Sequence, residues 1–452
     1  MTTQPRRRWF RFAFSLRTLL VLVSLVAALT AWFANERRQS QHELQIAEQL
    51  RQQGFDRIDF GGLNDSLELR SQGEPQGWWR DFTRRVRGER ILLLGGVSSI
   101  KDVSPLAGLT SLQALRVWGG PISDVTPLTG LTKLQSLDLS HSEINDLAPL
   151  ANLTALVSLR LHTEEITDLV PLASLTNLEN LSLGNSRVTD LAPLAALKNL
   201  KSLHLNHSQV TDLTLLAGHK NLQALWLGST QVTDLSPLAN LTNLRELWLF
   251  KTPVSDLTPL ARLANLQELW LSGTQVKDLT PLAGLMNLQE LWFKDTQVAD
   301  IARLAGLANL EKLFLTNSKV AELPTLVGLL RLKTFYVDST QVSDLGPLSV
   351  LDDLQELSVA NTRVNDLTPL AGLKCLKCLN WLNISDSHVS SLEPLASLKS
   401  LECLAADGTK IKDLTPLLKL IRLRWLGLER TQVSDEQIAA FRKALPKCEI
   451  KR

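Results

Sequence analysis

Residues 266–288 read LQELWLSGTQVKDLTPLAGLMNL, and this stretch decides the fold. Leu269 and Leu271 alternate with Glu268 and Trp270, which is the period-two pattern of a strand with one buried face. The same stretch supplies five further apolar positions: Val276, Leu279, Leu282, Leu285 and Leu288. One unit of this size cannot bury seven apolar side chains by itself, so it must stack on other units.

The unit recurs along most of the chain. Counted from Asp278, the same position returns every 22 residues from Asp102 to Asp366 and continues, after one interval of 25 residues, to Asp435. The sixteen positions are Asp102, Asp124, Asp146, Asp168, Asp190, Asp212, Asp234, Asp256, Asp278, Asp300, Glu322, Asp344, Asp366, Ser391, Asp413 and Asp435. A constant period of this length predicts a solenoid whose equivalent strands lie side by side in a parallel sheet.

Two polar positions of the unit are expected to have structural roles. Asp278 opens the segment DLTPL, where its carboxylate can accept the unpaired amides that begin a helical turn. A hydroxyl at the position of Thr274 can bond backbone groups of the adjacent turn in every layer. The repeated aspartates are therefore assigned to the scaffold and not to acid–base catalysis.

The consensus LxxLxLxx[ST]x[VI]xDLxPLAxL covers residues 91–434 and resembles the 22-residue leucine-rich repeats of the bacterial internalin family, with Ser or Thr where that family often has Asn. The resemblance implies an α/β repeat solenoid, a leucine-rich-repeat horseshoe with a parallel β-sheet on the concave face and short helical turns on the convex face. It also implies that the concave face recognises a protein.

The charge of the chain is unevenly distributed. Seven arginines and one glutamate fall within residues 1–38, so the rest of the chain has 41 basic against 45 acidic groups, a net charge of −4. A mildly acidic body is a poor nucleic-acid binder, because that affinity comes mainly from neutralising phosphates. No nucleic acid is therefore expected as a partner.

Residues 18–35 contain no charged side chain. At about 1.5 Å per residue they are just long enough to cross a hydrocarbon core of about 30 Å. Arginines concentrate before this segment, a bias that keeps the N-terminus in the cytoplasm and exports the remainder of the chain. The sequence thus predicts a single-pass cell-membrane protein with a cytoplasmic basic tail at 1–17 and an extracytoplasmic repeat domain. The alternative is a cleaved signal peptide, although no clean Ala-x-Ala site comes after the apolar run.

The other divisions rest on composition. Residues 36–54 are polar and helix-prone and are interpreted as a stalk. The end layers of a solenoid would expose Leu and Val to water, so an N-terminal cap is expected at 55–90 and a C-terminal cap at 435–452. The pattern from Ser434 to Gln437 is that of a capping box and predicts a helix at the C-terminal end.

The outward strand position of Trp270 is the most informative one for function. Six consecutive repeats carry an aromatic side chain there: Trp226, Trp248, Trp270, Trp292, Phe314 and Tyr336. With strands about 4.8 Å apart, this aromatic ladder is expected to run about 24 Å across the concave face. Exposed rings in this number favour a binding surface. The alternatives are rings that only stabilise one another and rings copied by repeat duplication.

Three glutamates border the aromatic ladder in successive repeats: Glu246, Glu268 and Glu290. An aromatic groove with an acidic border suits a peptide that carries basic groups, or a glycan stacked on the rings. These three glutamates and the six ladder residues are the candidate partner-binding residues. Arg116 and Arg160 lie on the same face several repeats away and are expected to contribute little.

No constellation in the sequence is typical of catalysis or of metal binding. Four histidines, at 141, 162, 204 and 207, fall on or near the concave face. Equivalent positions two repeats apart are separated by about 10 Å, too far to share a metal easily. Cys375 and Cys378 lie in LKCLKC, a three-residue duplication without a second pair, which disfavours a zinc or redox site. We therefore expect no enzyme activity, no cofactor and no metal.

These features predict a membrane-anchored bacterial protein that binds a protein or peptide through its concave face. Three alternatives stay open at this point. The first is a structural envelope scaffold that self-associates, the second is a glycan-binding module, and the third is an enzyme regulator on the cytoplasmic side. The sequence does not identify the ligand.

Overall fold

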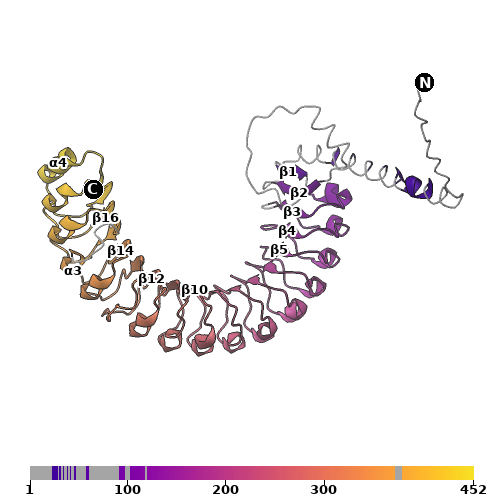
Figure 1. The fold of residues 1–452 in the computed structure, drawn as a ribbon, viewed down its shortest axis with the longest axis horizontal. Coiled ribbons are helices and arrows are strands. Elements are labelled where there is room, and N and C mark those ends of the chain that lie inside the picture. The colour runs from indigo at the N-terminus through magenta and orange to yellow at the C-terminus, as the bar shows by residue number, and fades with distance from the viewer. Residues whose placement is uncertain are drawn as a thin grey trace, which may run out of the picture.

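The computed structural model describes residues 102–117, 120–371 and 379–452, the strands at 57–60 and 91–96, and a few positions between 23 and 46. The described repeats form one curved solenoid. Strands line the inner, concave side of the arc and helical turns cover the outer, convex side (Figure 1). The predicted α/β repeat solenoid with a parallel sheet on its concave face is therefore confirmed.

The eighteen strands of the described chain form one open sheet, and neighbours in the sequence are neighbours in the sheet. The first two strands pair antiparallel, and each later strand pairs in parallel with the one before it. The strands are β1 (Arg57–Phe60), β2 (Ile91–Gly96), β3 (Ala114–Val117), β4 (Ser136–Asp138), β5 (Ser158–Arg160), β6 (Asn180–Ser182), β7 (Ser202–His204), β8 (Ala224–Trp226), β9 (Glu246–Trp248), β10 (Glu268–Trp270), β11 (Glu290–Trp292), β12 (Lys312–Phe314), β13 (Thr334–Tyr336), β14 (Glu356–Ser358), β15 (Trp381–Asn383), β16 (Cys403–Ala405), β17 (Trp425–Gly427) and β18 (Glu449–Lys451).

The convex side consists of single helical turns, nearly all of the 3-10 type. They are η1 (Ser104–Gly108), η2 (Thr126–Leu128), η3 (Ala148–Leu150), η4 (Val170–Ser174), η5 (Ala192–Ala196), η6 (Thr214–Gly218), η7 (Ser236–Leu238), η8 (Thr258–Arg262), η9 (Thr280–Leu282), η10 (Ala302–Gly306), η11 (Gly346–Val350), α3 (Thr368–Ala371), η12 (Glu393–Ser397) and η13 (Thr415–Lys419). Residues 322–330 form no such turn. In that repeat Pro324 comes one position earlier than Pro281 does in its own.

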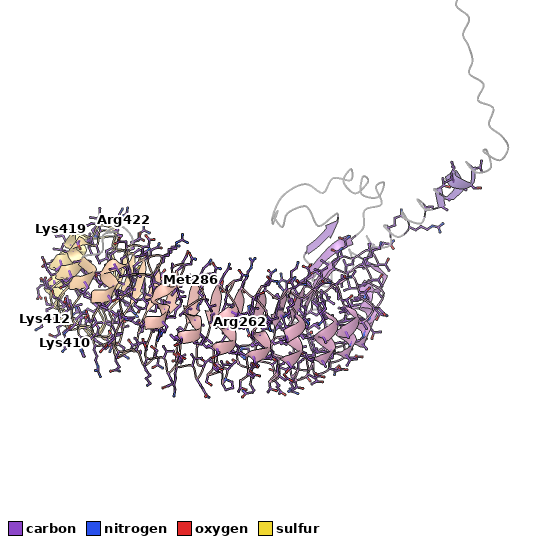
Figure 2. The ribbon with its side chains drawn as sticks, turned by 60° about the horizontal axis from the view of Figure 1, so that its bottom comes forward. Arg262, Met286, Lys410, Lys412, Lys419 and Arg422 are labelled. Atoms are coloured by element: carbon purple, nitrogen blue, oxygen red, sulfur yellow. The ribbon has the colours of Figure 1, made fainter. Side chains whose placement is uncertain are left out.

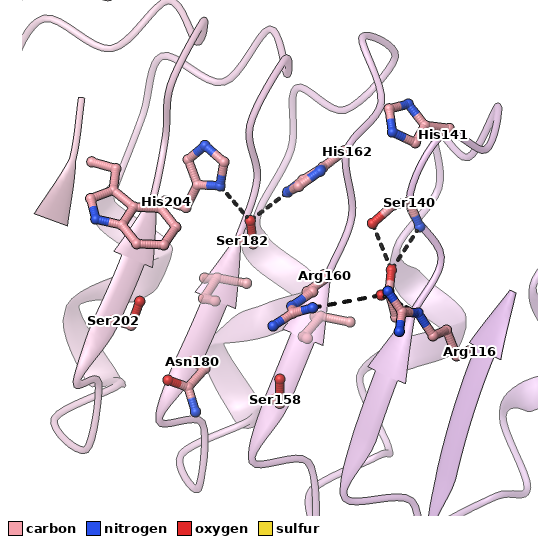
Figure 3. A pocket seen from close by; sticks show the side chains of 14 residues that line it. Arg116, Ser140, His141, Ser158, Arg160, His162, Asn180, Ser182, Ser202 and His204 are labelled. Carbon is pink, nitrogen blue, oxygen red and sulfur yellow. Dashed lines mark hydrogen bonds and ion pairs between the residues drawn. The ribbon is translucent and has the colours of Figure 1, made fainter. Parts of the chain in front are cut away.

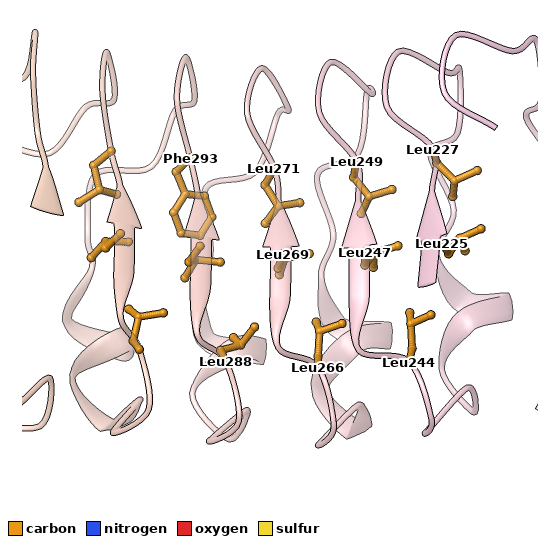
Figure 4. Close-up of a cluster of buried hydrophobic side chains, with 14 of the residues drawn as sticks. Leu225, Leu227, Leu244, Leu247, Leu249, Leu266, Leu269, Leu271, Leu288 and Phe293 are labelled. Atoms are coloured by element: carbon orange, nitrogen blue, oxygen red, sulfur yellow. The ribbon is translucent and has the colours of Figure 1, made fainter. Parts of the chain in front are cut away.

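One continuous apolar core lies between the sheet and the turns (Figure 4). The seven apolar positions predicted from residues 266–288 are all buried, each 1% exposed or less. Phe293 and Phe335 take leucine positions of this core and are fully buried. Because every layer covers the next, the predicted stacking of units is confirmed.

The repeated aspartate starts the helical turns as predicted. Asp278 Oδ1 accepts the N–H of Thr280 at 2.8 Å. Hydrogen bonds from the side chain and the amide of Thr280 hold the pKa of Asp278 below its usual value. Twelve equivalent residues accept the amide two positions later in the same way: Asp102, Asp124, Asp146, Asp168, Asp190, Asp212, Asp234, Asp256, Asp300, Asp344, Asp366 and Asp413.

Two further polar rows recur along the solenoid, one within each repeat and one between repeats. Thr274 Oγ1 donates to the carbonyl of Leu271 at 2.6 Å, as predicted for this hydroxyl. The prediction fails in three layers, because the buried hydroxyls of Ser186, Ser208 and Ser318 at the same position have no partner among the described residues. On the convex side, Asn287 Nδ2 donates to the carbonyl of Ala264 in the preceding repeat at 2.8 Å. The equivalent asparagines are Asn177, Asn199, Asn221, Asn243, Asn265 and Asn309. This asparagine row, which was not predicted, ties each of these seven repeats to its predecessor.

The C-terminal end is covered by α4 (Asp435–Ala444), whose Ile438 and Phe441 join the core. Ser434 accepts the N–H of Gln437 at 3.3 Å, as the capping pattern predicts. The side chain of Gln437 instead accepts the N–H of Leu414 at 3.2 Å. The predicted capping box is therefore half formed, because the glutamine ties the helix to the preceding repeat.

The predicted cell-membrane localisation is wrong. Within the residues that the structure describes, no helix is long and apolar enough to cross a bilayer. Of the predicted span, residues 23–28 and a few later positions are described. The proposed tail at 1–17 and most of the proposed stalk and N-terminal cap lie outside the described residues. An apolar composition indicates a candidate span, whereas crossing requires about 20 residues in one unbroken helix.

His219 occupies a core position that Leu197 and Leu241 hold in the adjacent repeats. The side chain is fully buried. Its Nε2 lies 3.0 Å from the carbonyl oxygen of Leu194, and its Nδ1 has no partner among the described residues. An unpaired buried nitrogen lowers stability, because it gives up hydration without a replacement bond.

We expect His219→Leu to raise the free energy of unfolding by about 1–2 kcal/mol. The Leu194 carbonyl keeps a partner, because it also accepts the N–H of Leu197 at 2.9 Å. Urea denaturation followed by circular dichroism measures the change. Leu241→His is the matched control and should lower stability. A less stable His219→Leu variant would contradict the prediction.

Candidate functional site on the concave face

The aromatic ladder lies at equivalent outward positions of β8 to β13. Consecutive ring centroids are 3.6–5.0 Å apart. Neighbouring tryptophans are stacked or tilted, Phe314 stacks on Trp292, and Tyr336 meets Phe314 edge-on. The structure thus brings all six predicted aromatic residues into one row.

Stacking hides most of each ring. The four tryptophans and Tyr336 are only partly exposed, and Phe314 is 9% exposed, because each ring covers a face of its neighbour. The rings are therefore less open than the sequence led us to expect. The indole Nε1 atoms of all four tryptophans are buried and lack a hydrogen-bond partner in the described part of the chain. Solvent reaches carbon atoms of the indoles, so the aromatic ladder presents a hydrocarbon strip.

The three glutamates form a second row beside the strip. Glu246, Glu268 and Glu290 lie opposite one another in register, and each is partly buried. Burial raises the pKa of Glu268, and the charges of the other two glutamates raise it further. Lys312 Nζ lies 2.7 Å from Glu290 Oε1 and neutralises that end of the row. Glu246 and Glu268 are left with mutual repulsion that a cation from a partner would relieve.

The ladder has a polar contact and a further ring at its C-terminal end. The Tyr336 hydroxyl donates to Glu356 Oε2 at 2.8 Å. Burial, and after it this hydrogen bond, raises the pKa of Tyr336. Trp381 of β15 adds a tilted ring 5.4 Å from Tyr336. Trp381 was not predicted, because it occupies the strand position of the glutamates and not that of the ladder.

Histidines continue the row at its N-terminal end. The ring of His204 packs edge-on against Trp226, with centroids 5.0 Å apart. Ser182 Oγ lies 2.8 Å from His204 Nδ1 and 2.5 Å from His162 Nε2. Burial lowers the pKa of both imidazoles, that of His204 to about 4, where neighbouring basic groups add to the effect. At His162 the carboxylate of Asp138 opposes the lowering of the pKa. His204 is therefore uncharged at neutral pH.

This serine–histidine contact was not predicted from the sequence. Among the described residues, no carboxylate accepts a hydrogen bond from His162 or His204. The contact therefore lacks the group that orients the base in serine hydrolases. The described residues also contain no cluster of three His, Cys, Asp or Glu side chains that could hold a metal ion. Cys375 and Cys378 lie outside those residues.

Beyond the histidines, Arg116, Asp138 and Arg160 occupy successive outward strand positions (Figure 3). Asp138 is 8% exposed, and its Oδ2 lies 3.3 Å from Arg116 Nε and 3.9 Å from Arg160 Nη1. Its Oδ1 accepts the Ser140 hydroxyl at 2.6 Å. The two arginine side chains stay 63% and 56% exposed. The buried carboxylate thus holds two exposed guanidinium groups beside each other.

The arginines and histidines line a hollow of about 600 Å³ that ends at Trp226. We call it the N-terminal hollow. The signal for it is present in the sequence, because Arg116, Asp138 and Arg160 stand at the same 22-residue spacing as the ladder. The expectation that Arg116 and Arg160 contribute little to partner binding stays a prediction.

The repeated strand–turn unit and its concave face define a leucine-rich-repeat protein. The family model for leucine-rich repeats in two copies matches residues 176–218, 220–262 and 264–306. Proteins with this fold are typically non-enzymatic binding or scaffold proteins. No curated protein matches the sequence.

Several solved structures are similar to this chain. A leucine-rich-repeat protein of Leptospira interrogans is 25% identical with a TM-score of 0.71, over 79% of this chain and 93% of that one. An internalin of Listeria monocytogenes is 29% identical with a TM-score of 0.58, over 70% of this chain and 86% of that one. This protein therefore has internalin-like bacterial neighbours.

A plant receptor shares the fold. The ectodomain of the Arabidopsis thaliana receptor kinase GASSHO1/SCHENGEN3, solved in complex with CASPARIAN STRIP INTEGRITY FACTOR 2, is 20% identical with a TM-score of 0.58. The match covers 74% of this chain and 46% of that one. At this identity the likeness concerns the fold alone.

Proposed function

We propose that this protein binds a protein or peptide partner on its concave face, with contacts centred on Trp248 and Trp270. The observation that carries the proposal is the hydrocarbon strip of the aromatic ladder beside a row of glutamates. Leucine-rich-repeat domains typically bind proteins, and the plant receptor structure is an example of such a complex. Tryptophan and tyrosine are also the residues most enriched at binding hot spots.

The chemistry of the face indicates what the partner carries. Apolar side chains would gain most by packing on the strip, because they remove its carbon surface from water. A basic group would be favoured beside Glu246 and Glu268, whose charges repel each other. The partner is therefore an extended segment with apolar side chains and at least one Lys or Arg.

A glycan fits this surface less well than a peptide does. Sugars stack on open aromatic faces, whereas the inner rings of the aromatic ladder cover one another at centroid distances of 4.3–4.7 Å. The outer side of Trp226 is covered by His204. Ring edges remain, and these suit apolar side chains.

The test selects peptides from a random display library against the full chain and measures their dissociation constants. For peptides that bind the concave face, the double variant Trp248→Ala, Trp270→Ala should raise Kd about thirty-fold or more, because central hot-spot truncations cost about 2 kcal/mol or more. Circular dichroism checks that the variant stays folded. Selected peptides are expected to be enriched in Lys or Arg.

The matched control removes apolar groups from the convex side. Met286 lies on that side (Figure 2) and is 52% exposed, and Val327, in the turn segment 322–330, is 55% exposed. Met286→Ala with Val327→Ala should therefore leave Kd unchanged. Peptide binding that the double tryptophan variant leaves intact would refute the proposal.

Sedimentation of the full chain over a range of concentrations tests the scaffold alternative. That alternative predicts assemblies that grow with concentration and weaken in the tryptophan variant.

A further inference from the structure

We propose that the N-terminal hollow is an anion-binding site in which Arg116 and Arg160 hold a carboxylate or phosphate group. The site stands on its own residues and does not depend on the aromatic ladder. The hollow lies at the end of the aromatic ladder, so it would receive an anionic group of the ligand that binds the ladder. This assignment to one shared ligand rests on the proposed function.

Both arginines have N–H donors that are not used in their contacts with Asp138. Arg116 uses Nε toward Asp138, and Arg160 approaches the same carboxylate only at 3.9 Å. A guanidinium has five N–H groups in a planar fork that matches carboxylate and phosphate oxygens. The terminal nitrogens of both arginines are therefore available on a surface that is more than half exposed.

The charge of the hollow is positive. Asp138 is the only acidic residue among those that line it, against two arginines. Both oxygens of Asp138 already have partners, since Oδ1 accepts from Ser140 and Oδ2 faces the arginines. This carboxylate therefore orients the two guanidinium groups and leaves one positive charge unbalanced.

Neutral donors complete the lining. Ser158, Asn180 and Ser202 lie in register on three successive strands and line the hollow. Their side chains make no hydrogen bond to any other described residue. Hydroxyl and amide groups without internal partners can donate to an anion, as the arginines can. The hollow thus combines charged donors with neutral ones, which is the composition of an anion site.

The hollow and the glutamate row have opposite charges. Trp226 lines the hollow and begins the aromatic ladder, and Glu246 lies on the next strand. A ligand with an anionic group in the hollow and basic groups beside the glutamates would be bound in one direction only. A peptide whose last residue carries the anion has this distribution.

The test titrates the full chain with inorganic phosphate and, separately, with acetate, and tracks the ring-proton NMR signals of His162 and His204. These signals are assigned with the variants His162→Gln and His204→Gln. We expect saturable shifts with at least one anion. Arg160→Gln and Arg116→Gln should each weaken that binding ten-fold or more, because each removes a charge-assisted pair. Arg262→Gln, on the convex side (Figure 2), should leave it unchanged.

Two further comparisons identify the kind of anion that binds and the property of Arg160 that binds it. A tripeptide with a free C-terminal carboxylate, compared with its carboxamide and with phosphate, shows whether a chain terminus or a phosphorylated group is the better ligand. Arg160→Lys keeps the charge but loses the planar fork of N–H donors, so it should weaken anion binding less than Arg160→Gln does. The lysine variant takes the place of Arg160→Gln in the comparison if the glutamine variant is unstable.

No saturable shift with either anion, or an anion affinity that both glutamine variants leave unchanged, would overturn the anion site. The variant Trp248→Ala, Trp270→Ala should bind phosphate or acetate as the unchanged protein does. Failure of the proposed function at the ladder is therefore distinguishable from failure of the anion site.

Discussion

Replacing Leu271 with alanine is expected to lower the free energy of unfolding by about 2–5 kcal/mol, as large-to-small core substitutions do. Leu271 is fully buried between the sheet and the turns, where the equivalent Leu249 and Phe293 pack in the adjacent layers. Neither neighbour can collapse into the space without breaking its own layer. The cavity therefore stays, and its cost adds to the lost burial.

Trp270→Ala is the comparison for this prediction, measured by urea denaturation of both variants. Trp270 is stacked between Trp248 and Trp292, and each aromatic pair contributes about 0.5–1.5 kcal/mol. We therefore expect a loss of about 1–3 kcal/mol, smaller than that of Leu271→Ala. A larger loss at Trp270 than at Leu271 would mean that the ladder belongs to the core and not to a binding surface.

Replacing Gly328 with alanine is expected to cost about 3 kcal/mol, at the upper end of the range for overpacked sites. A Cβ atom at this position would overlap the carbonyl oxygen of Ala305 in the preceding repeat. The overlap involves backbone, so no side-chain rotation can relieve it. Residues 322–330 lack the helical turn of the other repeats, and the two backbones come close together there.

Gly284→Ala is the matched control, two repeats before Gly328. A Cβ atom at Gly284 would meet nothing within 4 Å. That substitution is expected to raise stability by about 0.4–1 kcal/mol, because alanine restricts the unfolded chain. Thermal denaturation of the two variants gives the comparison. Similar effects of both substitutions would show that the close approach at Gly328 is absent in solution.

The architecture could be predicted from residues 266–288 and the 22-residue spacing. A constant interval forces equivalent residues into one column, and alternation of Leu269 with Trp270 assigns their opposite faces. The core, the aspartate turns and the row of ladder residues all result from these two facts. The membrane span was predicted from composition alone, and the structure does not contain a helix that meets the requirement in its described residues.

The candidate site could be predicted only in part. The spacing placed the six rings in one column, but it did not show that stacking would cover their faces and bury the indole N–H groups. The degree to which each ring covers its neighbour depends on side-chain torsions, which adjust to the size of the ring in the next layer. The contact of Trp381 with Tyr336 likewise joins two different strand positions.

The sequence by itself determined which residues share a column, because the repeat length leaves the backbone a single way to stack. Only the tertiary structure decided which chemistry each column presents. Burial lowers the pKa of His204 to about 4 and so keeps it uncharged. The buried carboxylate of Asp138 holds Arg116 and Arg160 together at the edge of a hollow. Such effects depend on solvent exposure and on distances between side chains, and neither is encoded in the spacing of residues along the chain.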